Sequence, residues 1–274
     1  MLHKFMIAIP TLIAGLFVYS FFIERYIVVV KEYNLEFRNL PENFEGYSLA
    51  IFSDLHYGSL MPEWFVLRII NKLNQLNADV ILGLGDYVKK RNTTEEIKKI
   101  WPHLQTLKAR DGVFLILGNH DHWASAEDSL KKLENSGMSV RHKHSCIKRG
   151  EDSICFIGAG DYWEDEPGFE KPIHNLESDS FRIVLAHSPD TADLPYHERV
   201  DLFLSGHTHG GQVVLPFTEY SPMVPVKNKK YNFGLKYNPK STPILISKGL
   251  GWSILPLRFN CYPEIILLKL YKKK

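Results

Sequence analysis

Short apolar runs that each end in a polar cluster are the feature that most constrains how this chain folds. Residues 49–52, 80–84 and 113–117 are apolar, and side chains bearing carboxylate, amide or imidazole groups follow each run closely. Apolar runs of this length are typical of strands buried on both faces, as in a largely parallel sheet. Apolar residues at helical spacing lie between the runs, so the first half of the chain is predicted to form a β-α-β-α-β unit.

The second half of the chain repeats this pattern with less helix. Four more apolar runs, separated by turn residues, predict a second sheet: residues 154–157, 183–185, 202–204 and 213–215. A capping box at Ser125 and Asp128 predicts the start of a further helix. No linker rich in Gly, Ser or Pro divides the chain, so residues 26–274 are predicted to form one domain. We expect an α/β fold with four layers, α/β/β/α, in which two mixed sheets lie face to face with helices outside.

The N-terminal residues 5–23 form a nearly continuous apolar run. As a helix this run would span about 28 Å, close to the roughly 30 Å hydrocarbon core of a bilayer. An uncleaved transmembrane anchor over residues 1–25 is favoured over a cleaved signal peptide, because Phe21, Phe22 and Ile23 are too bulky for a cleavage site. The charge balance around the run predicts a single pass through the inner membrane, with the bulk of the chain outside the cytoplasm.

The composition excludes some classes of partner and scaffold. With 33 Lys+Arg against 31 Asp+Glu, the chain lacks the broad basic field that holds nucleic acid, so no nucleic-acid partner is predicted. Three cysteines are too few for a disulfide framework, and none lies in a C-x-x-C pair. Cys146, Cys155 and Cys261 are therefore expected to be small core residues. No oligomeric state is predicted.

The polar clusters are expected to meet at one edge of the fold, since ligand sites of open α/β sheets lie beyond the carboxyl ends of the strands. The clusters offer carboxylate, amide and imidazole ligands: Asp54, His56, Asp86, Asn119, His187, His207 and His209. Each cluster alone could be an ordinary turn, and their order at strand ends gives them weight. These ligand types suit two divalent ions of Mn, Fe, Zn or Co, about 3.5 to 4 Å apart, with Asp86 shared between them.

The ordered set of motifs resembles that of the calcineurin-like metallophosphoesterases. The matching motifs are Ser53-Asp54-Leu55-His56, Gly85-Asp86, Gly118-Asn119-His120-Asp121, His187 and Gly206-His207-Thr208-His209. Residues 186–190, 210–212 and 258–264 further resemble the membrane-associated YaeI/YkuE-like bacterial phosphodiesterases. The resemblance implies the metallo-dependent phosphatase fold and two metal sites that share Asp86. One site would hold Asp54, His56, Asp86 and His209, and the other Asp86, Asn119, His187 and His207.

The same resemblance implies a reaction. The chain would be a membrane-anchored phosphoesterase that hydrolyses phosphodiester or pyrophosphate bonds with a metal-bridging hydroxide, on a phosphoester substrate that could be lipid-linked, such as UDP-2,3-diacylglucosamine. His120 would act as the acid, and Asp121 would fix its tautomer. Asp161, His122 and Arg258 are candidate substrate-binding residues.

Two other functions stay open at this point. The first is a metallo-β-lactamase-type hydrolase. The motif of that fold is H-x-H-x-D-H, whereas His207-x-His209 is followed here by Gly-Gly-Gln at residues 210–212. The second is a membrane scaffold that holds metals without turnover. Hydrolysis of a phosphodiester with added Mn²⁺ separates an enzyme from the scaffold.

Overall fold

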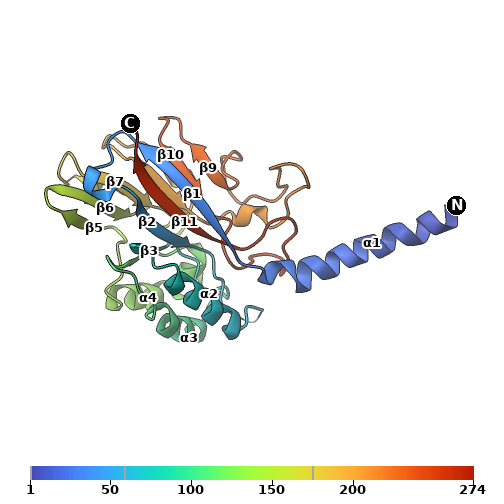
Figure 1. The fold of residues 1–274 in the computed structure, drawn as a ribbon. Helices are drawn as coiled ribbons and strands as arrows, with labels where there is room; N and C mark the ends of the chain where they lie inside the picture. The colour runs from blue at the N-terminus through green and yellow to red at the C-terminus, as the bar shows by residue number, and fades with distance from the viewer. Residues whose placement is uncertain (1, 59, 175) are drawn as a thin grey trace.

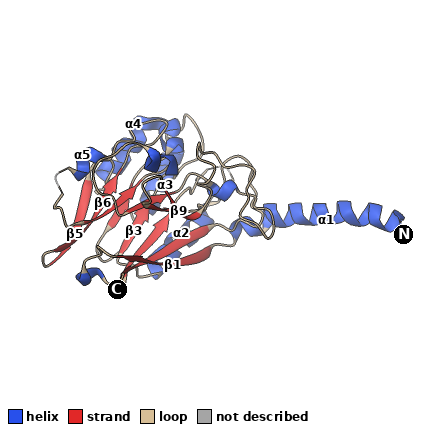
Figure 2. Cartoon of the chain, turned by 90° about the horizontal axis from the view of Figure 1, so that it is seen from above, coloured by secondary structure: helices blue, strands red, loops and turns tan. Residues whose placement is uncertain are grey.

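The computed structural model describes residues 2–58, 60–174 and 176–274. Among these residues the strands form two mixed sheets (Figures 1 and 2). The five-stranded sheet has the order β1-β11-β2-β3-β4, and its strands are β1 (Val29–Phe37), β2 (Tyr47–Phe52), β3 (Val80–Gly83), β4 (Val113–Leu115) and β11 (Glu264–Lys272). The six-stranded sheet has the order β5-β6-β7-β8-β10-β9, and its strands are β5 (His144–Arg149), β6 (Asp152–Gly158), β7 (Phe181–Leu185), β8 (Leu202–Ser205), β9 (Gly234–Tyr237) and β10 (Pro243–Ile246).

The predicted parallel unit is confirmed. Strands β2, β3 and β4 pair in parallel, and the helices α2 (Glu63–Gln75) and α3 (Glu95–Leu104) connect them. Side chains alternate between the two faces of β2 because the repeat of a strand is two residues. Leu49 and Ile51 lie in the core between the two sheets, whereas Ala50 and Phe52 pack toward the helices. Figure 1 shows α2, α3 and α4 (Asn119–Asn135) gathered on one side.

The outer face of the six-stranded sheet carries less helix than the predicted α/β/β/α arrangement gives it. The short helix α5 (Glu170–Ile173) and the 3-10 turn Pro189–Asp193 lie against the outer face of the six-stranded sheet. Side chains such as Phe169 and Tyr196 complete the cover by packing edge-to-face against Phe203. Aromatic side chains thus supply part of the cover that the prediction gave to helices.

Two local predictions have different outcomes. The helix predicted to begin at Ser125 is the second part of a longer helix: α4 begins at Asn119 and is kinked at Ser125, where φ is −170°, and the Asp128 backbone N–H donates to Ser125 Oγ. The strand predicted at residues 213–215 is wrong. Among the described residues there, pairing is limited to an isolated bridge between Val213 and Phe259, so the segment is a loop.

Two of the cysteines are bonded to each other, contrary to the prediction that all three are free core residues. Cys146 on β5 and Cys155 on β6 face each other directly in the antiparallel register and form a disulfide. The register brings their side chains to the same face of the sheet, and this closeness is what permits the bond. Cys261 is free and buried, as predicted.

The N-terminal run forms the helix α1 (Leu2–Phe22), which projects from the body in Figure 1. Its last turns pack on the domain: the Arg258 backbone N–H donates to the carbonyl of Ser20, and Tyr19 Oη lies 3.2 Å from Tyr262 Oη. Among the residues that the structure describes, no helix is sufficiently long and apolar to cross a membrane. The transmembrane helix predicted from the sequence is thus not supported. The domain boundary at residue 25 stays a prediction.

Candidate metal centre

The predicted ligands come from the loops that follow five different strands. Asp54 and His56 follow β2, Asp86 follows β3, and Asn119 begins α4 after β4. His187 follows β7, and the pair at positions 207 and 209 follows β8. All seven side chains are buried, with at most 9% of their surface exposed. The carboxyl ends of strands from both sheets therefore meet at one site, as the rule for α/β sheets predicts.

Ligand atoms lie within 4.8 Å of one another in three groups that could hold a metal ion. These groups are Asp54-His56-His209, His56-Asp86-His120 and Asp86-His187-His207. Asp86 belongs to two of them. Its Oδ2 lies 3.4 Å from His56 Nε2 and 3.3 Å from His187 Nε2. One carboxylate oxygen thus faces an imidazole of each predicted site, which is the position that a shared ligand requires.

Hydrogen bonds from the ring nitrogens orient two of the imidazoles. His187 Nδ1 donates to the carbonyl of Leu84 at 2.7 Å, which leaves Nε2 toward Asp86. His207 Nε2 lies 3.0 Å from the carbonyl of Pro225, and its Nδ1 lies 3.2 Å from His187 Nε2. A carbonyl that holds one ring nitrogen fixes which nitrogen can bind a metal.

The electrostatics of the centre show a balance between burial and charge. Burial lowers the pKa of His56 and His209 well below the ordinary value, so both rings are neutral. Burial also lowers the pKa of His207, to about 4. Burial opposes charge on His187 and Asp86 too, but their mutual attraction prevails: it raises the pKa of His187 to about 10 and holds the pKa of Asp86 well below its usual range. Metal binding to His187 would therefore displace a proton.

Unpartnered buried atoms show that divalent ions fit these residues. Asp54 Oδ1 and Asn119 Oδ1 are buried without a hydrogen-bond partner. The neutral imidazoles of His56 and His209 bring their Nε2 atoms to 2.9 Å, and Asp54 Oδ1 lies 3.4 Å from His209 Nε2. Buried polar atoms are costly without partners. A cation among these atoms would satisfy them.

The backbone is strained at five of the seven predicted ligands. They have positive φ angles between 49° and 66°, in the left-handed region that non-glycine residues rarely adopt: Asp54, His56, Asp86, His207 and His209. Such strain costs on the order of 1 kcal/mol or more at each residue and is typical of functional sites. Side chains of all five residues belong to the groups that could hold a metal ion.

Glycine permits the close approach of the loops at two positions. A Cβ atom on Gly118 would lie 2.3 Å from Asp86 Oδ1 and 2.7 Å from His187 Nε2. A Cβ atom on Gly206 would lie 1.9 Å from Ser53 Oγ. Both glycines of the predicted motifs therefore make room for the ligands beside them.

Asp121 has a role that differs from the predicted one. Its carboxylate accepts hydrogen bonds from the backbone N–H groups of Asp86, Tyr87 and Gly118 at 2.8 to 3.0 Å. His120 instead has its Nδ1 2.9 Å from the carbonyl of Lys89. The prediction that Asp121 fixes the His120 tautomer is thus wrong, because a backbone carbonyl provides that contact. Asp121 clamps the loop that carries Asp86.

The predicted substrate-binding residues lie in different environments. Asp161 is buried, and its Oδ1 accepts from the backbone N–H groups of Trp163 and Glu164. Half-buried His122 has an unpartnered Nε2, and burial lowers its pKa. Arg258 is fully buried, and its guanidinium donates to carbonyls at positions 248, 249, 251 and 261. This arginine therefore holds loops together, and the prediction that it contacts substrate finds no support.

Comparison with known proteins decides the family. The Calcineurin-like phosphoesterase family matches residues 47–211, more than half of the chain. The chain belongs to this family. The members of this family are metal-dependent phosphoesterases, which are hydrolases. In this chain, the buried Asp and His groups described above are the residues that could hold the metal ions.

Three relatives match this chain beyond residues 47–211. The "Uncharacterized metallophosphoesterase YkuE" of Bacillus subtilis is 32% identical over 92% of this chain and 88% of its own length. The "Phosphodiesterase YaeI" of Escherichia coli is 31% identical over 84% of each chain. A "Transmembrane protein with metallophosphoesterase domain" of Danio rerio is 29% identical over 88% of this chain and 57% of that protein. The calcineurin-like phosphoesterase domain of this chain thus resembles proteins from bacteria and animals.

The sequence does not predict two features of the centre. Gln212 has a φ of 61° and bonds the loop after His209 to residues 253–257. The carbonyls of Leu84 and Pro225 orient histidines but leave no mark in a pattern of side chains. The Gly-Gly pair before Gln212 is the one sequence signal that points to a turn there.

Proposed function

We propose that the protein hydrolyses phosphodiester or phosphoanhydride bonds with two divalent cations held by the seven buried ligands. The position of Asp86 Oδ2, at 3.4 Å from His56 Nε2 and 3.3 Å from His187 Nε2, carries this proposal. Asp54, His56, Asp86 and His209 would hold one cation, and Asp86, Asn119, His187 and His207 the other. When bound, the pair supplies a nucleophile from water at neutral pH and offsets charge on the phosphoryl oxygens.

The protein's own residues position this chemistry. Asp121 fixes the Asp86 loop through three backbone N–H groups, and the His120 backbone N–H donates to Asp86 Oδ1 at 2.8 Å. The His120 ring lies edge-on to His56, with 4.5 Å between centroids. Half-buried beside the ligands, His120 would donate a proton to the leaving oxygen. Asp161 and His122 are proposed to line the cleft.

Of the two alternative functions predicted from the sequence, one is replaced and one still needs a test. Membership of the calcineurin-like family replaces the metallo-β-lactamase reading. A scaffold that binds metals without turnover would use the same ligands, so only turnover separates it from the enzyme.

Turnover of bis-p-nitrophenyl phosphate tests the proposal. We expect hydrolysis with added Mn²⁺, a fall of more than about 100-fold after chelation, and recovery when Mn²⁺, Co²⁺ or Zn²⁺ is restored. Metal analysis of the active protein should give two ions per chain. Two bound ions without turnover of this or other phosphodiesters would support the scaffold instead.

We also propose that α1 holds the enzyme at a lipid surface. The helix projects from the body (Figure 1), and large apolar side chains along it and just beyond it are exposed by 41 to 64%: Leu12, Ile13, Leu16, Phe17, Val18, Phe22 and Ile23. Contact with lipid would remove this apolar surface from water. The Cys146–Cys155 disulfide supports the extracytoplasmic position predicted from the sequence, since such bonds persist in oxidising compartments. A UDP-2,3-diacylglucosamine substrate stays a prediction, which release of UMP would test.

Fractionation of cells that express the full chain tests this attachment. We expect the protein in the membrane pellet, with its domain digested when protease is added outside intact spheroplasts. Leu12→Asp with Phe17→Asp should reduce the pelleted fraction about tenfold or more, because two apolar side chains can no longer enter lipid. Leu67→Asp on α2, which is 41% exposed, is the matched control and should leave the distribution unchanged. Unaltered pelleting of the double variant would contradict the proposal.

A further inference from the structure

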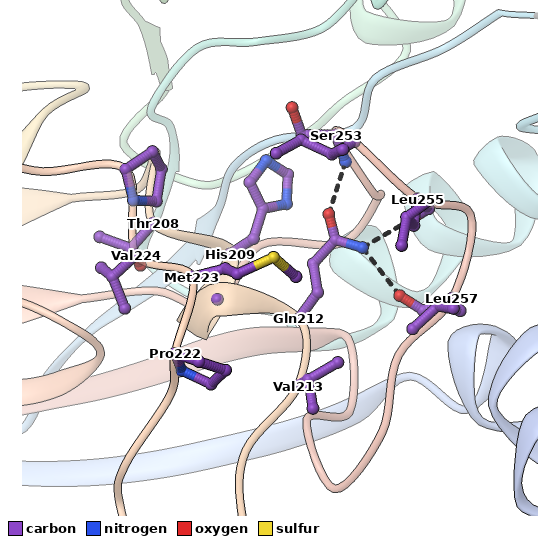
Figure 3. Close-up of a pocket in the computed structure, with 13 residues that line it drawn as sticks. Thr208, His209, Gln212, Val213, Pro222, Met223, Val224, Ser253, Leu255 and Leu257 are labelled. Carbon is purple, nitrogen blue, oxygen red and sulfur yellow. Dashed lines mark hydrogen bonds between the residues drawn. The ribbon is translucent and has the colours of Figure 1, made fainter.

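An apolar pocket of about 270 Å³ adjoins the metal centre. Figure 3 shows its walls, formed by the loop after β8 and by the loop before β11. His209, a predicted ligand, lies in the wall beside Thr208. Most of the remaining wall is aliphatic, with Met223 and Leu257 among the side chains that face the space. The pocket is thus an apolar surface next to the proposed reacting centre.

Gln212 fixes the far wall of the pocket. Its Nε2 donates to the carbonyls of Leu255 and Leu257 at 2.6 and 2.8 Å, and its Oε1 accepts from the Ser253 backbone N–H at 2.9 Å (Figure 3). These three bonds satisfy the polar groups of the loop within the protein. Because Gln212 holds the backbone of the loop, the side chains of the loop are free to form the wall, and the shape of the pocket does not depend on a ligand.

The same loop is tied to the base of α1. Arg25 Nη1 donates to the carbonyl of Pro256 at 2.8 Å, and the Arg258 backbone N–H donates to the carbonyl of Ser20. Ile254 and Leu255 on this loop are exposed by 74% and 48%, and Met223 opposite is exposed by 46%. The apolar rim of the pocket therefore lies beside the helix with the exposed apolar side chains.

We propose that this pocket receives an alkyl or acyl chain of the phosphoester substrate, while the phosphoryl group lies at the metal centre. The inference rests on the proposed function and adds a substrate class to it: phosphodiesters with an apolar substituent. Two observations select this occupant. His209 belongs both to the wall of the pocket and to the predicted ligands, so the pocket lies directly beside the centre. A volume of about 270 Å³ admits a chain of several methylenes and is small for a protein segment.

The rate of hydrolysis should therefore rise with the length of an alkyl substituent. The probes are the methyl, butyl and octyl esters of p-nitrophenyl phosphate, used below their aggregation concentrations with Mn²⁺. All three have the same leaving group, so a difference in kcat/KM reports on the alkyl chain. Each methylene buried contributes roughly a factor of four, so we expect the octyl ester to exceed the methyl ester by at least about tenfold.

Charged substitutions at the exposed rim test whether the alkyl chain binds in this pocket or the enzyme merely prefers apolar esters in general. Met223→Asp and Leu255→Asp should each bring the octyl-to-methyl ratio of kcat/KM close to one. Both positions are partly exposed in the folded protein, so a charge there remains hydrated. Leu67→Asp, on α2 and outside the lining of the pocket, should keep the wild-type ratio.

The outcomes of this experiment test the pocket and the proposed phosphoesterase function separately. Hydrolysis of the methyl ester with a wild-type ratio near one, or Asp variants that keep the wild-type ratio, would overturn the pocket and leave the proposed function intact. If none of the three esters nor bis-p-nitrophenyl phosphate is hydrolysed, the proposed function itself fails. A ratio that rises with chain length and collapses in both rim variants supports the assignment.

Discussion

Replacing Asp86 with Ala is expected to remove metal and turnover together. Its Oδ2 faces one imidazole of each proposed site, at 3.4 Å for His56 and 3.3 Å for His187. Loss of this oxygen would weaken both sites at once, whereas loss of any other ligand would weaken one. Removal of groups that merely support a ligand typically costs 10 to 100-fold, so a shared ligand should cost more than about 100-fold in kcat/KM. Metal analysis should show the content falling well below two ions per chain.

A buried carboxylate away from the centre provides the control. Asp201 accepts hydrogen bonds from the Arg182 backbone N–H and from Asn39, and it is 8% exposed. Asp201→Asn should keep both metals and normal turnover even if the melting temperature falls. Asp86→Ala with two metals per chain and wild-type kinetics would show that the carboxylate does not bridge.

The position of the Asp86 carboxylate follows from signals that the sequence contains. An apolar strand that ends in a polar residue places that residue at the carboxyl edge of the sheet. Because β2, β3 and β4 pair in parallel, their ends are neighbours in space. The order of the clusters therefore predicts which side chains meet. The apolar spacing of α2 and α3 likewise predicts the parallel unit, since burial of one helical face repeats every 3.6 residues.

The backbone geometry of the ligands could not be predicted in the same way. Asp54, His56 and Asp86 adopt left-handed φ angles in loops that bond to each other: the Asp54 N–H donates to the Gly85 carbonyl, and the His56 N–H donates to the Asp86 carbonyl. Residues other than glycine prefer other regions of φ and ψ, and Asp and His tolerate this one better than most, so local propensity alone does not predict the observed turn. Packing between distant elements overrides the propensity, and no pattern of single residues reports such packing.

The Cys146–Cys155 bond depends on a turn whose residues are visible in the sequence. Gly150 has a φ of 63° and lies between the paired residues Arg149 and Asp152, as in a tight hairpin turn. The two cysteines lie the same number of residues from this turn, so a hairpin centred there would place them opposite each other. The number of cysteines alone carries no information about this turn and so does not predict the bond. Register, which is a property of two strands together, was the missing information.

The position of Arg258 depends on contacts that the sequence does not show. A charged residue is seldom buried without partners, so a lone arginine is expected at the surface or at a ligand. Here five carbonyl contacts to four residues replace water. Those carbonyls come from the turns at residues 248–251 and 258–261, whose proximity depends on the whole fold. The chemistry of the residue is thus evident from the sequence, whereas its location is not.

Replacing His120 with Ala is expected to leave metal in place and to slow esters with poor leaving groups. The ring is oriented by the 2.9 Å contact of Nδ1 with the Lys89 carbonyl, and its centroid lies 4.6 Å from that of Trp123, with the two rings tilted by 57°. A phenyl ester leaves as a basic phenolate that gains from protonation, whereas p-nitrophenolate leaves without it. We expect kcat for a phenyl phosphodiester to fall by about 10² to 10⁴, and kcat for the p-nitrophenyl ester to fall much less.

The comparison of leaving groups separates an acid from a metal ligand. His120 lies within 4.8 Å of ligand atoms of His56 and Asp86, so a direct role in holding a cation is the competing explanation. If His120 were a ligand, its loss would lower metal content and would slow both esters by a similar factor. His103→Gln, on the surface beside Glu63, is the matched histidine control and should alter neither measure. Retained metal with a selective loss on the phenyl ester would assign proton transfer to His120, because only that step depends on the basicity of the departing oxygen.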